Sequence, residues 1–124
     1  MGILTLNTDG CSKGNPGVSG GGGVLRDSNG RVLVEYSAFL EVNTSLCTEA
    51  LALLTGLRLC FQKGYAQVRV QSDSPVVVGI LELRFQCPWH IRREVRQIWR
   101  LATDLGQFFH SFREANKVVD ILAN

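Results

Sequence analysis

Four carboxylates hold positions in the sequence from which they could bind a metal ion: Asp9, Glu49, Asp73 and Asp120. Asp9 ends a strand-like alternating segment, and Asp73 ends another, just before an expected helix. Sites of α/β sheets form at the carboxyl ends of strands, so two acids there are suggestive. Glu49 lies in the first turns of an expected helix, and Asp120 lies one turn into the last one. Taken alone, each acid also has an ordinary explanation as a turn former, a cap or a partner of the helix dipole.

The four acids together would favour cations over any other partner. Carboxylates that converge from different elements repel one another unless positive charge lies between them. Hard oxygen ligands in this number suit Mg²⁺ or Mn²⁺ and do not suit zinc. Two such ions close together can activate a water and stabilise the leaving oxygen of a phosphodiester. Convergence itself cannot be read from the sequence.

The elements that must position these acids follow from hydrophobic periodicity. Apolar and polar residues alternate over the segments expected to be strands, 3–9, 21–26, 31–39 and 67–72, and a short strand is expected at 108–112. Helical spacing covers residues 46–61, 74–84 and 91–105, and Asn116 caps a last helix. Asn29-Gly30 is typical of a hairpin, and residues 10–23 form a glycine-rich stretch with a turn at Asn15-Pro16-Gly17. A meander followed by alternating helices and strands predicts a mixed sheet with helices on its faces.

Length and composition indicate one small globular domain, residues 1–124. The hydrophobic fraction of 45% argues against disorder. No apolar run approaches the roughly 20 residues of a membrane helix, and no signal peptide precedes the first strand. Because the elements begin and end close to the chain ends, we expect a domain taken from something larger. The four cysteines form no C-x-x-C pair, so we expect reduced thiols and an intracellular setting, nucleus or cytoplasm, with two disulfides as the alternative.

An ordered set of motifs resembles ribonuclease H, and the likeness covers nearly the whole chain. The closest likeness is to the type 1-like domains of plant genomes, which occur as separate genes and at the ends of non-LTR retroelement polyproteins. The motifs come in the family's order and at its usual separations. They are Thr8-Asp9-Gly10, Gly14-Asn15-Pro16-Gly17, Thr48-Glu49-Ala50, Ser72-Asp73-Ser74, and Arg113-Glu114-Ala115-Asn116 with Asp120 and Leu122-Ala123.

This resemblance implies a fold, an activity and a metal site. The implied fold is a five-stranded mixed sheet, a three-strand antiparallel meander followed by two parallel strands, with helices on both faces. The implied activity is endonucleolytic hydrolysis of the RNA strand of an RNA/DNA hybrid, leaving a 5′-phosphate and a 3′-hydroxyl. The implied cofactor is Mg²⁺ or Mn²⁺, two ions per site, and by position the ligands are Asp9, Glu49, Asp73 and Asp120.

Further residues match the family's substrate contacts and catalytic helpers. By position, the contacts to the hybrid would come from Gly10, Cys11, Asn15, Thr44, Ser45 and Asn116. Three residues before Glu49, where many relatives have Asn, this chain has Leu46, which puts one hybrid contact in doubt. His110 and Arg113 are competing candidates for assistance in catalysis, and His110 could equally be an ordinary strand residue.

The charge pattern fits a phosphate-binding protein better than the net charge does. The formal net charge is only +2, but without the four proposed ligands seven acids face 13 bases. The helix from Ile91 carries arginines away from its apolar stripe, at 92, 93, 96 and 100, and Trp89 or Trp99 could stack on nucleic acid, although Trp99 is better explained as core. We expect an RNA/DNA hybrid as partner, bound modestly and in a salt-sensitive way, by a monomer without membrane attachment.

Two alternatives to an active ribonuclease H stay open. One is a weakly active or inactive nucleic-acid-binding domain of a larger reverse-transcriptase polyprotein, which Leu46 mildly favours and the four acids disfavour. The other is a 3′–5′ exonuclease of the same broad fold. The Asn15-Pro16-Gly17 turn after the first acid favours the ribonuclease.

Overall fold

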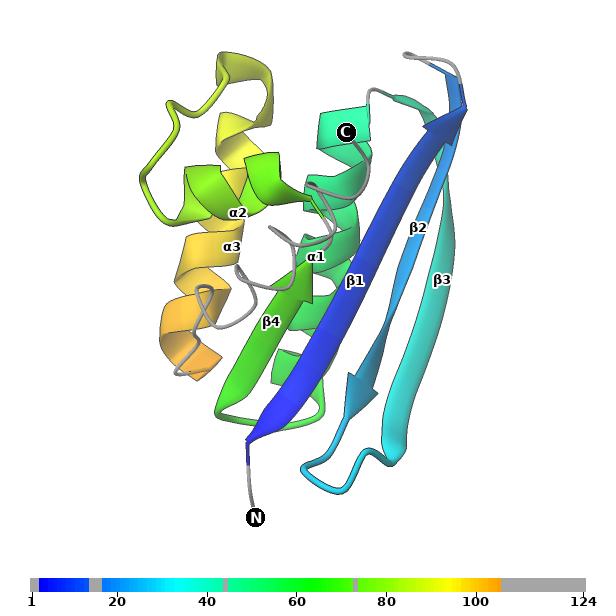
Figure 1. Ribbon diagram of the computed structural model, residues 1–124, viewed down its shortest axis with the longest axis vertical. Coiled ribbons are helices and arrows are strands. Elements are labelled where there is room, and N and C mark those ends of the chain that lie inside the picture. The colour runs from blue at the N-terminus through cyan, green and yellow to red at the C-terminus, as the bar shows by residue number, and fades with distance from the viewer. Residues whose placement is uncertain (1–2, 14–16, 44, 73, 106–124) are drawn as a thin grey trace.

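A four-stranded mixed sheet forms the centre of the molecule (Figure 1). The computed structural model describes residues 3–13, 17–43, 45–72 and 74–105. The strands are β1 (Leu4–Lys13), β2 (Gly17–Arg26), β3 (Val32–Asn43) and β4 (Val68–Ser72), in the order β3-β2-β1-β4. The first three form an antiparallel meander, and β4 pairs with β1 in parallel. The predicted meander and parallel pair are confirmed, while the fifth strand expected at 108–112 lies outside the described residues.

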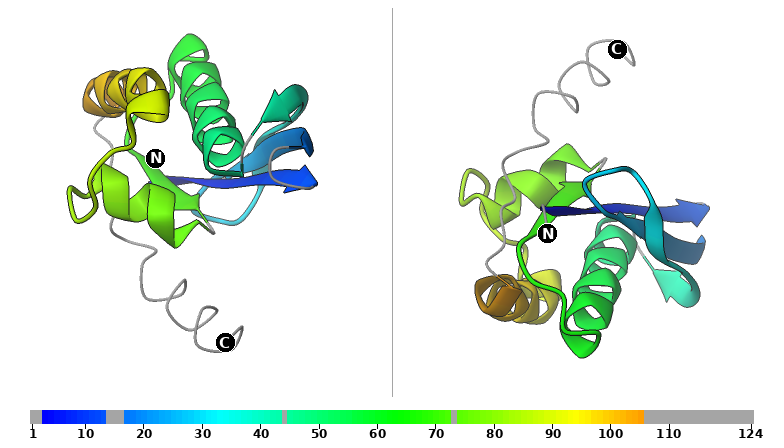
Figure 2. Two further views of the ribbon diagram at one scale, coloured as in Figure 1. Left: turned by 90° about the horizontal axis from the view of Figure 1, so that it is seen from above. Right: turned by 90° about the horizontal axis from the view of Figure 1, so that it is seen from below.

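Helices flank this sheet as the alternating pattern predicts. They are α1 (Ser45–Gln62), α2 (Pro75–Leu81) and α3 (Arg92–Leu105), and a short 3₁₀ turn, η1 (Trp89–Ile91), leads into α3. Figure 2 shows α1 and α3 side by side over one face of the sheet. The helix expected to begin at Asn116 lies outside the described residues.

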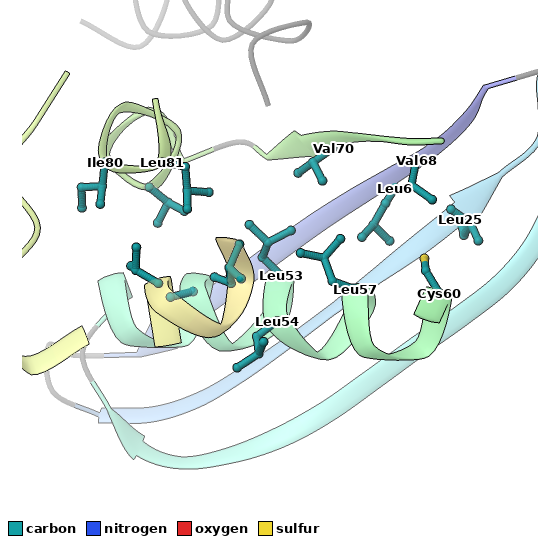
Figure 3. Packing of buried hydrophobic residues seen from close by; sticks show 14 of the residues in the cluster. Leu6, Leu25, Leu53, Leu54, Leu57, Cys60, Val68, Val70, Ile80 and Leu81 are labelled. Carbon is teal, nitrogen blue, oxygen red and sulfur yellow. The ribbon is translucent and has the colours of Figure 1, made fainter. Parts of the chain in front are cut away.

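The core lies between α1 and the sheet (Figure 3). One stripe of α1, spaced three or four residues apart, is fully buried, which is why residues 46–61 show helical periodicity. It packs against alternate residues of β1 and β4 and against apolar residues of α2 and α3. The labelled members are Leu6, Leu25, Leu53, Leu54, Leu57, Cys60, Val68, Val70, Ile80 and Leu81.

The glycine-rich stretch is largely strand, which corrects the expectation that β1 ends at Asp9 and β2 begins at Gly21. Gly10 pairs with Gly21, and Cys11 pairs with Gly20. The physical reason is that β1 and β2 continue their backbone pairing through these glycines, and at Gly23 the Tyr36 side chain takes the space of a Cβ. A Cβ on Gly23 would lie 2.6 Å from the Tyr36 hydroxyl and from the Asn7 carbonyl, so β2 carries glycine there to admit the ring.

The turn between β2 and β3 confirms the hairpin prediction. The Asp27 carboxylate accepts hydrogen bonds from the backbone amides of Asn29 and Arg31, each at 2.9 Å. Gly30 has a φ of +85°, a conformation that glycine adopts without strain. These bonds set the register between β2 and β3.

Helix α2 ends at Leu81, earlier than the expected end near residue 84. Leu83 has a φ of +64°, which turns the chain back over the helix. The Gly79 carbonyl then accepts from the amides of Arg84 (2.8 Å) and Phe85 (3.1 Å). Trp99 of α3 donates its indole N–H to the Leu81 carbonyl at 3.3 Å, so Trp99 serves the core, as expected.

Cysteines 47, 60 and 87 are free thiols in the structure, in line with the expectation of reduced cysteines. The side chain of Cys11 is not among those described. Across the described ranges, no helix has both the length and the apolar character needed to cross a bilayer.

Candidate active site at the carboxyl edge of the sheet

The parallel pairing of β1 with β4 sets the candidate site. Thr8 and Ser72 form the last pair between β1 and β4, although β1 continues beyond it and pairs with β2. Asp9 follows Thr8 and pairs on its other side with Gly22 of β2. Asp73 follows Ser72 and lies outside the described residues. The strand register thus brings together the two residues that directly precede the two candidate acids.

Helix α1 carries the third candidate acid, Glu49. Glu49 lies in the second turn of α1, between Thr48 and Ala50, which are both fully buried. Its own side chain is half-buried. The buried neighbours seat this turn of α1 against the rest of the molecule, so Glu49 has a fixed backbone position and retains contact with solvent.

Buried hydroxyls gather next to these acids in the sequence. Among the described residues, four polar side chains are buried: Thr8, Thr48, Ser72 and Ser74. Each of them is an immediate sequence neighbour of Asp9, Glu49 or Asp73. A buried hydroxyl is costly without a hydrogen-bond partner, so hydroxyls confined to these positions indicate a polar site there rather than more apolar core.

The turn that carries Asp73 is held on both sides. The Ser74 amide donates to the Ser72 hydroxyl oxygen at 3.2 Å. The Ser74 hydroxyl oxygen accepts from the Val77 amide, also at 3.2 Å, and so caps α2 as the Ser74-Pro75 pair predicts. The flanking residues of position 73 are therefore fixed by hydrogen bonds and burial.

The chemistry of the donor set fits a hard divalent cation. The four proposed ligands are all carboxylates, which suit Mg²⁺ or Mn²⁺. Cys47, two residues before Glu49, is a poor competitor, because burial and then the nearby Glu94 raise the pKa of its thiol and keep it protonated. The described side chains contain no cluster of three or more metal-ligating residues. Such a cluster would need Asp9, Asp73 and Asp120, whose side chains are not described.

Several other predicted site residues also lie outside the described part of the chain. These are Asn15, Thr44, His110, Arg113, Asn116 and Asp120. The backbones of Gly10 and Cys11 belong to β1, beyond Asp9, and Ser45 is the first residue of α1. Leu46 packs against the hydrophobic core.

Sequence reasoning did not single out Thr8, Thr48 and Ser72 as parts of the site. The motifs contain them, but their burial was not foreseen. The available signal was a small hydroxyl residue directly beside an acid, at the end of an apolar alternation in β1 and β4.

Several known proteins are similar to this chain in sequence and in fold. The family described as "Reverse transcriptase-like", a family of ribonuclease H-like domains, matches residues 7–124. The chain belongs to this family. An Arabidopsis thaliana protein, At1g65750, named as a candidate ribonuclease H protein, is 34% identical over 126 residues, which covers all of this chain. The chain spans only about a fifth (20%) of the length of that relative.

Solved structures of ribonucleases H share the fold. The RNase H1 of the halophilic archaeon Halobacterium salinarum NRC-1 is 25% identical with a TM-score of 0.82, over 94% of this chain and 90% of that one. LC11-RNase H1, solved in complex with an RNA/DNA hybrid, is 25% identical with a TM-score of 0.78, over 91% of this chain and 88% of that one. The ribonuclease H-like fold expected from the sequence is thereby confirmed.

Proposed function

We propose that this chain is a metal-dependent endoribonuclease that hydrolyses the RNA strand of RNA/DNA hybrids. The observation that carries the proposal is the set of buried hydroxyls beside the candidate acids. They flank Asp9 and Asp73 where the parallel pairing of β1 with β4 stops, and they flank Glu49 on α1, within a fold that ribonucleases H share. Two of these hydroxyls, those of Ser72 and Ser74, accept hydrogen bonds from backbone amides and so order the turn that carries Asp73.

In this proposal Asp9, Glu49, Asp73 and Asp120 hold two Mg²⁺ or Mn²⁺ ions. When bound, the ions supply an activated water and neutralise the charge that develops on the phosphodiester. The role of the chain is to hold the acids in place. The Ser72 and Ser74 hydrogen bonds fix the turn that carries Asp73, and the burial of Thr48 and Ala50 fixes the turn that carries Glu49.

Contacts to the hybrid come, in this proposal, from the residues that match the family's substrate contacts by position in the sequence. They are Gly10, Cys11, Asn15, Thr44, Ser45 and Asn116, and His110 or Arg113 assists catalysis. The Leu46 side chain packs against the core, so its position offers apolar packing instead of a polar contact to the substrate. This substitution supports modest affinity for the hybrid.

We also propose that residues 1–124 form one domain that acts as an intracellular monomer or as part of a longer retroelement-type polyprotein. The large size of the plant relative, of which this chain matches 20%, supports the second arrangement.

The test is a cleavage assay on end-labelled substrates with either metal. The substrates are an RNA/DNA hybrid, duplex RNA, duplex DNA and the single strands. We expect internal cleavage of the RNA strand of the hybrid alone, with 5′-phosphate products. Binding of the hybrid without cleavage in either metal would instead support an inactive binding domain, and shortening from the 3′ end would support an exonuclease.

A further inference from the structure

An exposed tryptophan lies at the start of α3. Trp89 is 82% exposed, the largest value among the exposed apolar residues of the described ranges. It lies in η1, between segments that are well packed. Ile91 in the same turn is fully buried, and Cys87, two residues before Trp89, packs against the core. Trp89 is therefore displayed on a fixed turn.

Arginines share the helix face that begins with Trp89. Because η1 continues directly into α3, residues 89, 92, 93 and 96 follow the i, i+3, i+4, i+7 spacing of one helix face. All four side chains are exposed, as is His90, whose ring meets the Trp89 ring edge-on at 6.1 Å between centroids. We call Trp89, His90, Arg92, Arg93 and Arg96 the Trp89 surface.

The charge of this region favours a polyanion over a protein partner. Five arginines and two glutamates lie between residues 82 and 100. One of them, Arg84, pairs with Glu82 at 3.1 Å. Within the described ranges no ion pair involves the arginines of the Trp89 surface. Tryptophan and arginine are common at protein interfaces too, so the deciding feature is the charge: the Trp89 surface has three arginines and no acid, which matches the positive grooves with exposed aromatic rings that bind single-stranded nucleic acid.

The Trp89 surface lies at the same end of the molecule as the first turns of α1. Helices α1 and α3 pack together and both begin at the same end of the molecule (Figure 1). Glu94, in the first turn of α3, is close enough to Cys47 to act on its thiol electrostatically. Cys47 lies two residues before Glu49 but on a different side of α1. The Trp89 surface and Glu49 therefore lie at the same end of α1, and a nucleic acid that extends from Glu49 toward α3 reaches this surface.

A tryptophan ring stacks on a base only where a base face is open. In a duplex the faces are covered by neighbouring base pairs, so a blunt end offers one face of a paired base, whereas each base of an unpaired segment can offer its faces to a stacking ring. From the exposed ring and the adjoining arginines we infer that the Trp89 surface binds the single-stranded segment that flanks an RNA/DNA hybrid. This inference rests on the proposed function for the hybrid and adds a preference for hybrids with an unpaired tail.

The first experiment measures binding in EDTA, so that no cleavage occurs. The probes are a blunt hybrid, the same hybrid with an RNA tail, the same hybrid with a DNA tail, and the single strands. Stacking on one base is commonly worth a factor of about 5 to 150 in affinity, so Trp89→Ala should weaken binding of a tailed hybrid by that factor. Binding of the blunt hybrid should change less than about twofold, and Trp89→Phe should retain most of the tail preference.

Phe61 provides the matched control. It is also an exposed aromatic residue, 52% exposed, but lies near the last turn of α1. Phe61→Ala should leave both affinities unchanged. Replacing both Arg92 and Arg93 with glutamine removes two positive charges. For the tailed hybrid, this should reduce the slope of the logarithm of the binding constant against the logarithm of the salt concentration by about 1.4 to 1.8.

Tryptophan fluorescence gives a direct readout, because the chain has two tryptophans and Trp99 is half-buried. The difference between wild type and Trp89→Phe isolates the Trp89 signal. A tailed hybrid should cut acrylamide quenching of Trp89 at least twofold, and a blunt hybrid should not. Equal affinity for blunt and tailed hybrids, with Trp89 still accessible to the quencher, would overturn the inference. In that case, cleavage of the hybrid would still support the proposed function.

Two other outcomes are also decisive. If Trp89 is shielded by tailed hybrid but no hybrid is cleaved with either metal, the Trp89 surface stands and the proposed activity fails. If Trp89 becomes shielded at rising protein concentration without nucleic acid, the surface is a contact between copies of the chain, and the inference is wrong.

Discussion

Replacing Gly56 with alanine should destabilise the protein, although alanine is the better helix former. In a free helix, Gly→Ala stabilises by about 1 kcal/mol. Here a Cβ on Gly56 would lie 2.9 Å from a Leu6 methyl and 3.0 Å from the Tyr36 ring, and closer still to the Tyr36 hydroxyl. That hydroxyl donates to the Ala52 carbonyl at 2.7 Å and joins β3 to α1 across the glycines of β2.

The magnitude follows from these contacts. Overpacking of a core costs about 1–3 kcal/mol, and loss of the Tyr36–Ala52 hydrogen bond costs about 1 kcal/mol more. After the helix gain is subtracted, Gly56→Ala should lower the free energy of unfolding by about 1–3 kcal/mol. At about 4 °C per kcal/mol for a chain of this size, the expected Tm falls by about 4–12 °C.

A double-mutant cycle with Tyr36→Phe tests the cause. Tyr36→Phe alone should cost about 1 kcal/mol, and Gly56→Ala should cost less in the Phe background, because the nearest clashing atom is gone. We expect a coupling of about 0.5–2 kcal/mol in urea unfolding. Stabilisation by Gly56→Ala in the wild-type background, or an additive cycle, would refute this account of how α1 is seated.

Three further predictions concern the thiol, the turn and the metal. Burial raises the pKa of Cys60 from its ordinary value of 9.0 to about 11, so the stability it contributes is complete below pH 9 and is lost as the pH rises to 11; denaturant unfolding should show a larger loss in wild type than in Cys60→Ala, where Cys47 and Tyr36, whose pKa values burial also raises, still lose stability at high pH. Ser74→Ala removes the cap of α2 and should cost about 1 kcal/mol and raise the Mg²⁺ concentration needed for cleavage, while Ser74→Thr retains the capping hydroxyl; unchanged metal dependence would separate this turn from the site. Mg²⁺ should raise the Tm, since binding to the folded state alone stabilises it, and a Tm in saturating Mg²⁺ equal to that in EDTA would contradict a folded-state metal site.

Local patterns in the sequence were sufficient to predict most of the described helices and strands. Alternation located β4, helical spacing located α1 and α3, and Asn29-Gly30 and Ser74-Pro75 marked a turn and a helix start that the structure confirms. Each of these signals is made by neighbours in the chain, so one sequence suffices to detect it. The order of these elements predicted a mixed sheet with helices on its faces, and the resemblance to ribonuclease H supplied the number and directions of the strands.

What the sequence did not reveal depends on contacts between distant residues. Glycines at 20–23 indicate a loop by local rules, but Tyr36 of β3 needs the space that a glycine strand leaves. The early end of α2 depends on two distant contacts. The Phe85 amide donates a hydrogen bond back to the Gly79 carbonyl, and the Trp99 indole donates one to the Leu81 carbonyl. The burial of the hydroxyls beside the candidate acids likewise required the β1–β4 register.

The most direct test of the central claim is hybrid cleavage by the Glu49→Gln variant. Glu49 is the candidate ligand whose half-buried side chain the structure describes, and glutamine has nearly the same shape without the charge. We predict that wild type cleaves the RNA strand of a hybrid in Mg²⁺ and that Glu49→Gln loses at least about a hundredfold in rate, with an unchanged circular dichroism spectrum. Cleavage by Glu49→Gln at a rate near that of wild type, with the same metal dependence, would contradict the account.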